Sequence, residues 1–156
     1  MFVKKLILMV GTGLGAGFSP FFPGTVGSLW GVLIYILLIK FTGYNILWQI
    51  IVSLVFIFLG IFISGECEKI LKDKDSQSIV IDEITGFLVS TIGIPFSPFF
   101  LFLAFLFFRL FDITKPFSLQ KLQNLPGGLG VIADDVAAGL LANLSLRILI
   151  SMAGLS

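Results

Sequence analysis

The sequence predicts an all-α, polytopic membrane protein, and three observations support this prediction. The 156 residues are 57% hydrophobic and 12% charged, and the mean hydropathy of +1.10 lies far above that of soluble chains. Several apolar stretches carry no charged residue and are long enough to cross a bilayer as helices. Glycine and proline lie between or inside these stretches, where helices end or bend. We expect a single helical membrane domain over residues 1–156, with four or five spans.

The expected spans follow from the uncharged stretches in chain order. The first is Gly24–Ile39, after a stretch rich in glycine and proline. The second is Phe41–Gly65, which at about 1.5 Å per residue is long enough to cross. A polar loop is expected over Glu66–Ser78. The last span, Val136–Leu155, is apolar except for Arg147, which we expect to reach the outer surface or to pair locally.

The segment Ile84–Phe108 is uncharged but is interrupted by Gly93, Pro95 and Pro98. As one straight helix, it would separate the acids before it from those after it. As a re-entrant hairpin bent at Ile92–Pro98, it would return both ends to the same side. Membrane helices tolerate proline and glycine, so the interruption alone does not decide between these alternatives.

The distribution of positive charge favours the hairpin over residues 84–108. With the N-terminus inside and Arg109–Ala133 as an inner loop, the outer side carries only Lys40 and Arg147. The inner side then carries Lys4, Lys5, Lys69, Lys72, Lys74, Arg109, Lys115 and Lys121. This is the asymmetry that the positive-inside rule describes.

The composition also excludes several kinds of chemistry and partner. The chain has no histidine, which excludes histidine-based acid/base catalysis and histidine-ligated zinc. One cysteine, Cys67, excludes an internal disulfide. A net charge of +1 leaves no basic footprint for nucleic acid, so we expect no nucleic-acid partner. The sequence gives no indication of the oligomeric state.

Acidic residues gather at the rims of the apolar segments. Acids at the edge of a bilayer are costly unless they are paired, hydrated or bound to a cation. Helix starts explain some of them, since acids there interact favourably with the helix dipole and one aspartate can cap a helix. A cap does not readily explain two adjacent aspartates, and we therefore expect a metal site. The candidate metal ligands are Asp82, Glu83, Asp112, Asp134 and Asp135.

The first acidic pair belongs to a helix in which Asp82, Gly86 and Ser90 share one face. This face can pack closely on a neighbouring helix and hold Asp82 inward. Glu83 points about 100° away, so it either reaches round into the same site or faces water.

Basic residues lie near the same acids. Arg109 and Asp112 are three residues apart, as are Asp112 and Lys115, which a plain salt-bridge ladder would explain. However, Pro116 favours an extended conformation at Lys115, so the helix ends there and the lysine can bind a phosphate as a point charge. With Lys121, three cations face five carboxylates, and one divalent cation would neutralise the difference. Only oxygen ligands are available, which favours Mg²⁺.

The stretch Gly11–Ser28 is rich in glycine and ends just before a helix, where Thr25 and Ser28 add hydroxyl groups. A helix N-terminus favours phosphate, so these two residues are candidates for substrate binding. It is no P-loop, because no Gly-Lys-Ser/Thr ends it. The alternative is close packing of helices through small residues, and the two interpretations are equally supported.

Four blocks of sequence, in this order, resemble the phosphatidylglycerophosphatase A family of bacterial membrane enzymes. They are Gly11–Ser28, Ile79–Gly86, Phe108–Pro116 and Gly127–Gly139. The resemblance implies a phosphoric monoester hydrolase that removes the terminal phosphate of phosphatidylglycerophosphate with Mg²⁺ and gives phosphatidylglycerol. It also implies an all-helical fold in the bacterial inner membrane, with the site facing the cytoplasm.

The resemblance assigns roles to residues of this chain. It makes the five carboxylates candidates for metal binding and catalysis, and the expected catalytic residues are Asp82, Glu83, Asp112 and Asp135. Lys115 and Arg109 fit as phosphate binders. Relatives often carry a His-Asp pair where this chain has Lys74 and Asp75. The histidine therefore cannot be essential here, and Asp75 is a weaker site candidate.

Two other functions are consistent with the acidic residues. A lipid transferase using the same metal would need the Asp-Gly spaced acids typical of such enzymes, which are missing. A small membrane cation transporter would use the same carboxylates, but their position at the rim argues against it, since a transport site lies near the midplane.

Overall fold

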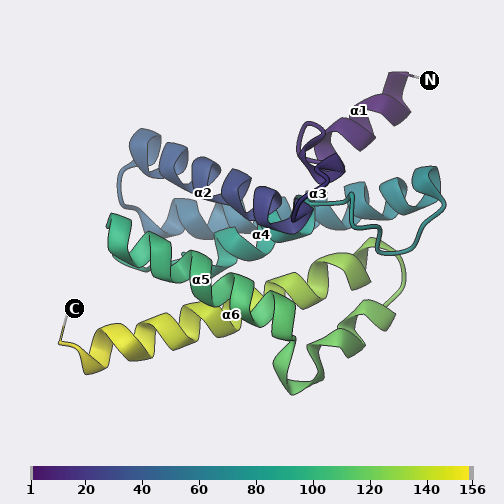
Figure 1. The fold of residues 1–156 in the computed structure, drawn as a ribbon. Coiled ribbons are helices and arrows are strands. Elements are labelled where there is room, and N and C mark those ends of the chain that lie inside the picture. Colours follow the sequence, from purple (N-terminus) through teal and green to yellow (C-terminus); the bar gives the residue numbers. More distant parts are fainter. Residues whose placement is uncertain (1, 155–156) are drawn as a thin grey trace.

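The computed structural model describes residues 2–154, which form helices joined by short connections (Figure 1). The α-helices are α1 (Phe2–Gly11), α2 (Pro23–Thr42), α3 (Ile46–Leu71), α4 (Ile81–Ser90), α5 (Pro98–Thr114) and α6 (Gly128–Met152). Two 3-10 segments are η1 (Ala16–Phe18) and η2 (Pro116–Asn124). No strand occurs among these described residues, which confirms the all-α prediction.

Three helices, α2, α3 and α6, are long and apolar enough to cross a membrane. With 17 residues, α5 is about 25 Å long, slightly short of the roughly 30 Å of a hydrocarbon core. The helices α1 and α4 have 10 residues each, about 15 Å, and cannot cross alone. The expectation of four or five spans therefore stays a prediction beyond these three helices.

The hairpin expected over residues 84–108 is present, because α4 and α5 run in opposite directions from a non-helical bend (Figure 1). Gly93 occupies the bend with a φ of +67°, a conformation that favours glycine. Its N–H donates to Oε1 of Gln49 on α3 at 2.8 Å. The Ser97 hydroxyl then accepts from the N–H of Phe100 at 3.1 Å and caps the start of α5.

Two side chains of α6 hold the bend at the end of α4. Asn143 Nδ2 donates to the carbonyls of Ser90 and Ile92 at 2.9 and 2.8 Å. Arg147 donates to the Ile92 carbonyl through Nη2 and to Asn143 Oδ1 through Nε, both at 2.8 Å. We call Asn143 and Arg147 the polar clamp. They satisfy backbone groups that α4, ending short of a full span, would otherwise leave unpaired. The local pairing expected for Arg147 is thus observed.

The helices α4 and α6 pack against each other through glycine. A Cβ atom on Gly86 would lie 2.5 Å from the carbonyl oxygen of Asp135 and 2.6 Å from the ring of Phe108. Across the interface, Gly139 of α6 lies against the Gly86 carbonyl. Small residues allow membrane helices to approach this closely. The contact places the first turn of α4 beside Asp135.

Several helix boundaries differ from the sequence prediction. The helix α3 continues to Leu71 through the segment expected to be a loop from Glu66. Its charged side chains are tolerated because this part extends beyond the apolar run, and Lys69 pairs with Glu66 one turn away at 2.6 Å. The loop predicted over Arg109–Ala133 was also too long, because α5 continues to Thr114.

The start of α6 is a second correction. The helix begins at Gly128, earlier than the predicted Val136, so Asp134 and Asp135 lie inside it. The first turn of α6 is fixed on α3, where Ser64 Oγ donates to the Gly128 carbonyl at 3.3 Å. Leu155, the predicted end, lies outside the described residues.

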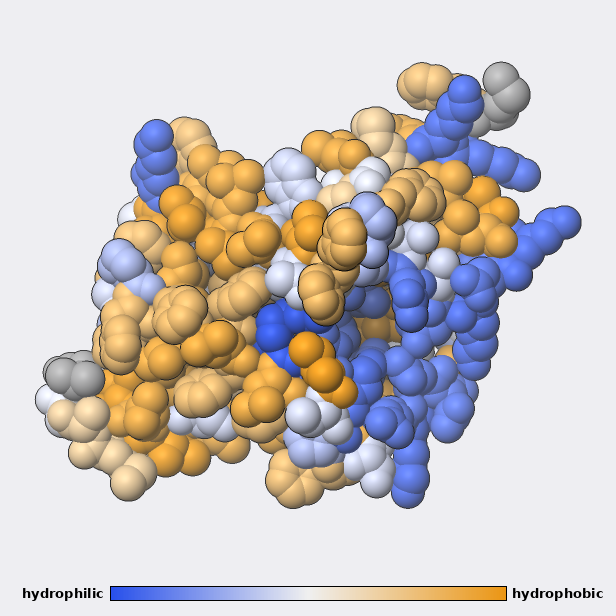
Figure 2. Space-filling view, viewed as in Figure 1, coloured by the Kyte–Doolittle hydropathy of each residue, from blue (hydrophilic) through white to orange (hydrophobic). Residues whose placement is uncertain are grey.

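Most hydrophilic side chains gather at one end of the molecule, over the end of α3, the loop after it and η2 (Figure 2). Much of the remaining surface is apolar and exposed, including Phe58, Phe62 and Phe102. An apolar belt with one polar end is the surface of a protein that sits in a membrane and meets water at that end.

Candidate active site

A pocket of about 140 Å³ opens at the polar end. Its walls come from the loop before α4, the first turn of α4, the ends of α5 and η2, and the first half of α6. It is lined by Asp75, Ser76, Gln77, Ile79, Asp82, Glu83, Asp112, Lys115, Gln123, Asp134 and Asp135. The structure therefore brings the five predicted carboxylates and Lys115 together around one space.

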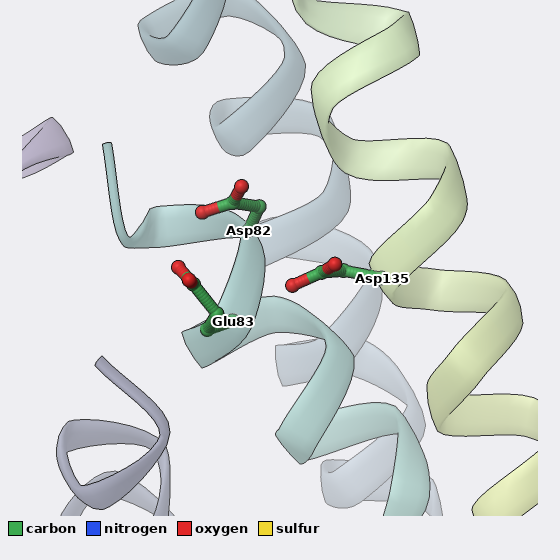
Figure 3. Close-up of side chains that lie close together, drawn as sticks. All are labelled: Asp82, Glu83 and Asp135. Carbon is green, nitrogen blue, oxygen red and sulfur yellow. The ribbon is translucent and has the colours of Figure 1, made fainter. Parts of the chain in front are cut away.

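Three of these carboxylates form a close group. Asp82 and Glu83 begin α4, and Asp135 points toward them from α6 (Figure 3). Each offers an oxygen within 4.8 Å of the other two. Among the described residues, Asp82 Oδ1, Glu83 Oε2 and Asp135 Oδ2 are buried with no hydrogen-bond partner. Buried carboxylate oxygens without partners are costly, and a hard cation that prefers oxygen ligands would satisfy them. The residues present thus fit Mg²⁺.

Asp112 joins the pocket from α5. Its carboxylate is buried and pairs with the guanidinium of Arg109, one turn earlier on the same helix. Arg109 does not line the pocket but lies beside it, against the first turn of α2. A Cβ atom on Gly24 would lie 3.1 Å from its Nη1, and its Nε is buried with no partner.

Lys115 reaches the pocket because α5 ends where Pro116 follows. The extended conformation predicted for Lys115 is wrong: the residue is left-handed (φ 43°), and its N–H donates to the Phe111 carbonyl at 2.8 Å, which closes the last turn of the helix. Its ammonium pairs with Asp134 of α6 and not with Asp112, so the alternative of a salt-bridge ladder holds only for Arg109 and Asp112. Burial alone would lower the pKa of Lys115, but the hydrogen bond to Asp134 and the nearby acids raise it above its usual value. The lysine therefore stays charged at neutral pH.

The sequence analysis underrated one polar residue of the pocket, Asp75, and missed three others, Ser76, Gln77 and Gln123. Asp75 Oδ2 accepts from Gln123 Nε2 at 2.8 Å, and the Asp75 N–H donates to Glu68 Oε1 at 2.8 Å. Burial raises the pKa of Asp75. Its place in the family pattern was a usable signal. Gln123 gave none, since one glutamine in a polar loop does not stand out.

Thr25 and Ser28 are not among the residues that line the pocket. Ser28 is buried, and its hydroxyl donates to the Gly24 carbonyl of its own helix at 2.9 Å. Nearby, a Cβ atom on Gly27 would lie 2.8 Å from Val80. These contacts agree with the interpretation of the glycine stretch as close helix packing. A role for Thr25 and Ser28 in substrate binding stays a prediction.

Fold and pocket together define the class: a helical membrane protein with a pocket of carboxylates and one lysine at its polar end. Residues 9–150 match the family described as Phosphatidylglycerophosphatase A. The chain belongs to the phosphatidylglycerophosphatase A family. The resemblance seen in the sequence is thereby confirmed, as is the expectation of an enzyme of the phosphatase class.

Three relatives resemble most of the chain. Two are named phosphatidylglycerophosphatase A. The one from Haemophilus influenzae is 36% identical over 90% of this chain and 89% of its own length, and the one from Escherichia coli K12 is 29% identical over 86% and 77%. A protein from Bacteroides thetaiotaomicron, named "Putative phosphatidylinositol-3-phosphatase", is 38% identical over 86% of this chain and 87% of its own length. No solved structure matches the chain.

Proposed function

We propose that this protein hydrolyses the terminal phosphate monoester of phosphatidylglycerophosphate, with Mg²⁺ as cofactor, and releases phosphatidylglycerol and phosphate. Membership of the family and the names of two relatives support the reaction. The observation that supports Mg²⁺ as cofactor is the group Asp82, Glu83 and Asp135. Each of these carboxylates has a buried oxygen without a hydrogen-bond partner.

In this proposal, Asp82, Glu83 and Asp135 hold the metal, and Asp112 and Asp134 add negative charge around it. Mg²⁺ usually binds through a few carboxylates together with substrate phosphate, which suits an open pocket better than a closed cage. When bound, the ion supplies Lewis-acid chemistry at the phosphoryl group.

The remaining chemistry belongs to the chain's own side chains. The Lys115 ammonium, held by Asp134, offsets charge that develops on the phosphoryl oxygens, and Arg109 adds a second cation beside Asp112. Attack by water at phosphorus requires a proton acceptor. We assign this role to Glu83 or Asp135, through a carboxylate oxygen that does not bind the metal. The proton moves to one of them as the bond from phosphorus to the glycerol oxygen breaks, and the departing glycerol oxygen takes a proton from water in the open pocket to give the alcohol.

We place the protein in the bacterial inner membrane with the pocket facing the cytoplasm. The polar end that contains the pocket also carries most of the positive charge, including Lys69, Lys72 and Lys115, as the positive-inside rule expects.

The decisive experiment is phosphate release from phosphatidylglycerophosphate by purified protein in detergent, with Mg²⁺ and then with chelator. We expect release that chelator abolishes and added Mg²⁺ restores. Phosphate release that continues in the presence of chelator would contradict the proposed dependence on Mg²⁺. No release by folded protein would contradict the substrate, and cation flux in liposomes would then test the transporter alternative.

Phosphatidylinositol-3-phosphate belongs in the same assay, because the relative from Bacteroides thetaiotaomicron is named for that substrate and is 38% identical. We expect a higher kcat/KM for phosphatidylglycerophosphate. The reverse order would reassign the lipid while keeping the reaction class.

A further inference from the structure

An apolar groove of about 390 Å³ runs between α2 and α5. It is lined by Leu29, Val32, Pro98, Leu101, Phe102 and Phe105. Leu29 and Phe102 are 53% and 58% exposed, so the groove is open on its outer side. Its volume lies within the range of roughly 300–1,000 Å³ typical of ligand pockets.

Both walls of the groove lead to the pocket along single helix faces. On α5, Pro98, Phe102, Phe105, Arg109 and Asp112 are spaced by four, three, four and three residues, which places them on one face. Asp112, at the end of this row, lines the pocket.

The opposite wall shows the same pattern. On α2, Thr25, Leu29 and Val32 are spaced by four and three residues. The row begins in the first turn of α2, which lies beside Glu83.

The positively charged side chain of Arg109 lies where the groove meets the pocket. The guanidinium of Arg109 reaches across from α5 to α2, where a Cβ atom on Gly24 would lie 3.1 Å from Nη1 and 3.2 Å from Nη2. Arg109 also pairs with Asp112, and its buried Nε has no partner. In Figure 2, hydrophilic surface interrupts the hydrophobic surface over the later part of α5. The groove is thus apolar along its length and has a guanidinium at its inner end, next to Asp112 and Glu83.

We propose that this groove binds one acyl chain of an anionic phospholipid, with the lipid headgroup at Arg109 and its phosphate monoester in the pocket. The identification of that lipid as the substrate rests on the proposed function. A groove open toward the bilayer admits a chain that never leaves the hydrocarbon. Guanidinium groups bind phosphate through paired hydrogen bonds. A water-soluble phosphate would gain nothing from the apolar walls, whereas an anionic lipid matches both parts.

A binding experiment tests the groove without turnover. The protein is placed in nanodiscs that contain phosphatidic acid with a photoactivatable acyl chain, and labelled peptides are identified by mass spectrometry. We expect labelling to concentrate on residues 29–32 of α2 and 101–105 of α5. The Arg109→Gln change should lower this labelling roughly tenfold, the loss expected when a site loses its hydrogen-bonding partner for the ligand. Labelling of α3 should not change.

Phosphatidylcholine with the same acyl chain is the matched control, and it should label the groove less. Equal labelling by both lipids, or labelling spread evenly over the exposed faces of α2, α3 and α5, would overturn the proposal.

Kinetics provide the second test. Leu29→Trp fills the groove, whereas Leu59→Trp makes the same change at a residue of α3 that is 52% exposed and outside the groove. The substrates are long-chain phosphatidylglycerophosphate and its deacylated headgroup. We expect Leu29→Trp to raise the KM ratio of the lipid to the headgroup roughly tenfold, and Leu59→Trp to leave it unchanged.

An unchanged KM ratio in Leu29→Trp would overturn the proposal that the groove binds an acyl chain. If wild-type protein hydrolyses neither substrate but shows the expected labelling, the groove stands and the proposed reaction fails.

Discussion

The carboxylate oxygens of Asp82, Glu83 and Asp135 that lack partners set the chemistry of this site at the level of single residues. Asparagine keeps the shape of aspartate but removes the charge that a cation needs. We expect Asp82→Asn, Asp112→Asn and Asp135→Asn each to lower phosphate release by about 100-fold or more, as the loss of a charge-stabilising group commonly does.

Asp73→Asn is the matched control, since Asp73 is an exposed loop acid. Without metal, Asp135→Asn should unfold at a higher temperature than wild type, because it relieves repulsion among the acids. Near-normal rates in all three site variants would rule out the assignment.

The ion pair of Lys115 predicts how the stability of the fold depends on pH. Its pKa is raised in the folded protein, so the ion pair with Asp134 stabilises the fold fully below the unfolded pKa of about 10.4. That contribution is lost as pH rises through the higher folded value. Thermal unfolding should show Lys115→Met less stable than wild type at pH 7–9, with the gap closing above about pH 10.5.

The exposed Lys72→Met serves as control and should show little difference at any pH. A Lys115→Met gap that stays constant to high pH would mean that packing, not charge, carries the effect.

At the scale of helices, the contact between α4 and α6 sets the position of the acids. A Cβ atom on Gly86 would meet backbone, so Gly86→Ala must push the helices apart. We expect a lower unfolding temperature and a large loss of activity. In Gly60→Ala, the new atom would lie 2.7 Å from the terminal methyl of Ile132, which can rotate away. That variant should retain most activity, and equal losses in the two variants would refute the argument.

The sequence predicted which segments are helical better than it predicted the residues at which the helices begin and end. The hairpin over 84–108 followed from charge distribution, because a single misplaced span would put like charges on the wrong side. The predicted boundaries were wrong at the ends of α3 and α5 and at the start of α6. Hydropathy indicates which residues lie in the bilayer. A helix continues for as long as its backbone hydrogen bonds do, and these can extend beyond the bilayer. The acids of the pocket were found because charge beside apolar sequence is costly. Gln123 was missed because its role depends on a contact with Asp75, 48 residues away.

At the scale of the whole molecule, the orientation in the membrane is testable. The connection between α2 and α3, which we propose to lie outside, contains Tyr44, and the loop after α3 at the polar end contains Asp73, both exposed. The native Cys67 is buried and should not react. An impermeant maleimide should label Tyr44→Cys in intact spheroplasts and Asp73→Cys only after lysis. The opposite pattern would place the pocket outside the cytoplasm.

The polar clamp has a consequence for the order in which the protein folds during synthesis. Asn143 lies 53 residues after Ser90, whose carbonyl it holds, so the ribosome adds it later, by several seconds at roughly 5–20 residues per second. Until α6 is inserted, the bend at the end of α4 has no donor from the clamp, and α4 cannot settle at its final depth. The pocket, which includes Asp134 and Asp135 of α6, therefore cannot be complete before α6 is in place. A nascent chain arrested before α6 carries Asp82 and Glu83 but lacks Asp134 and Asp135, so we expect it to be inactive.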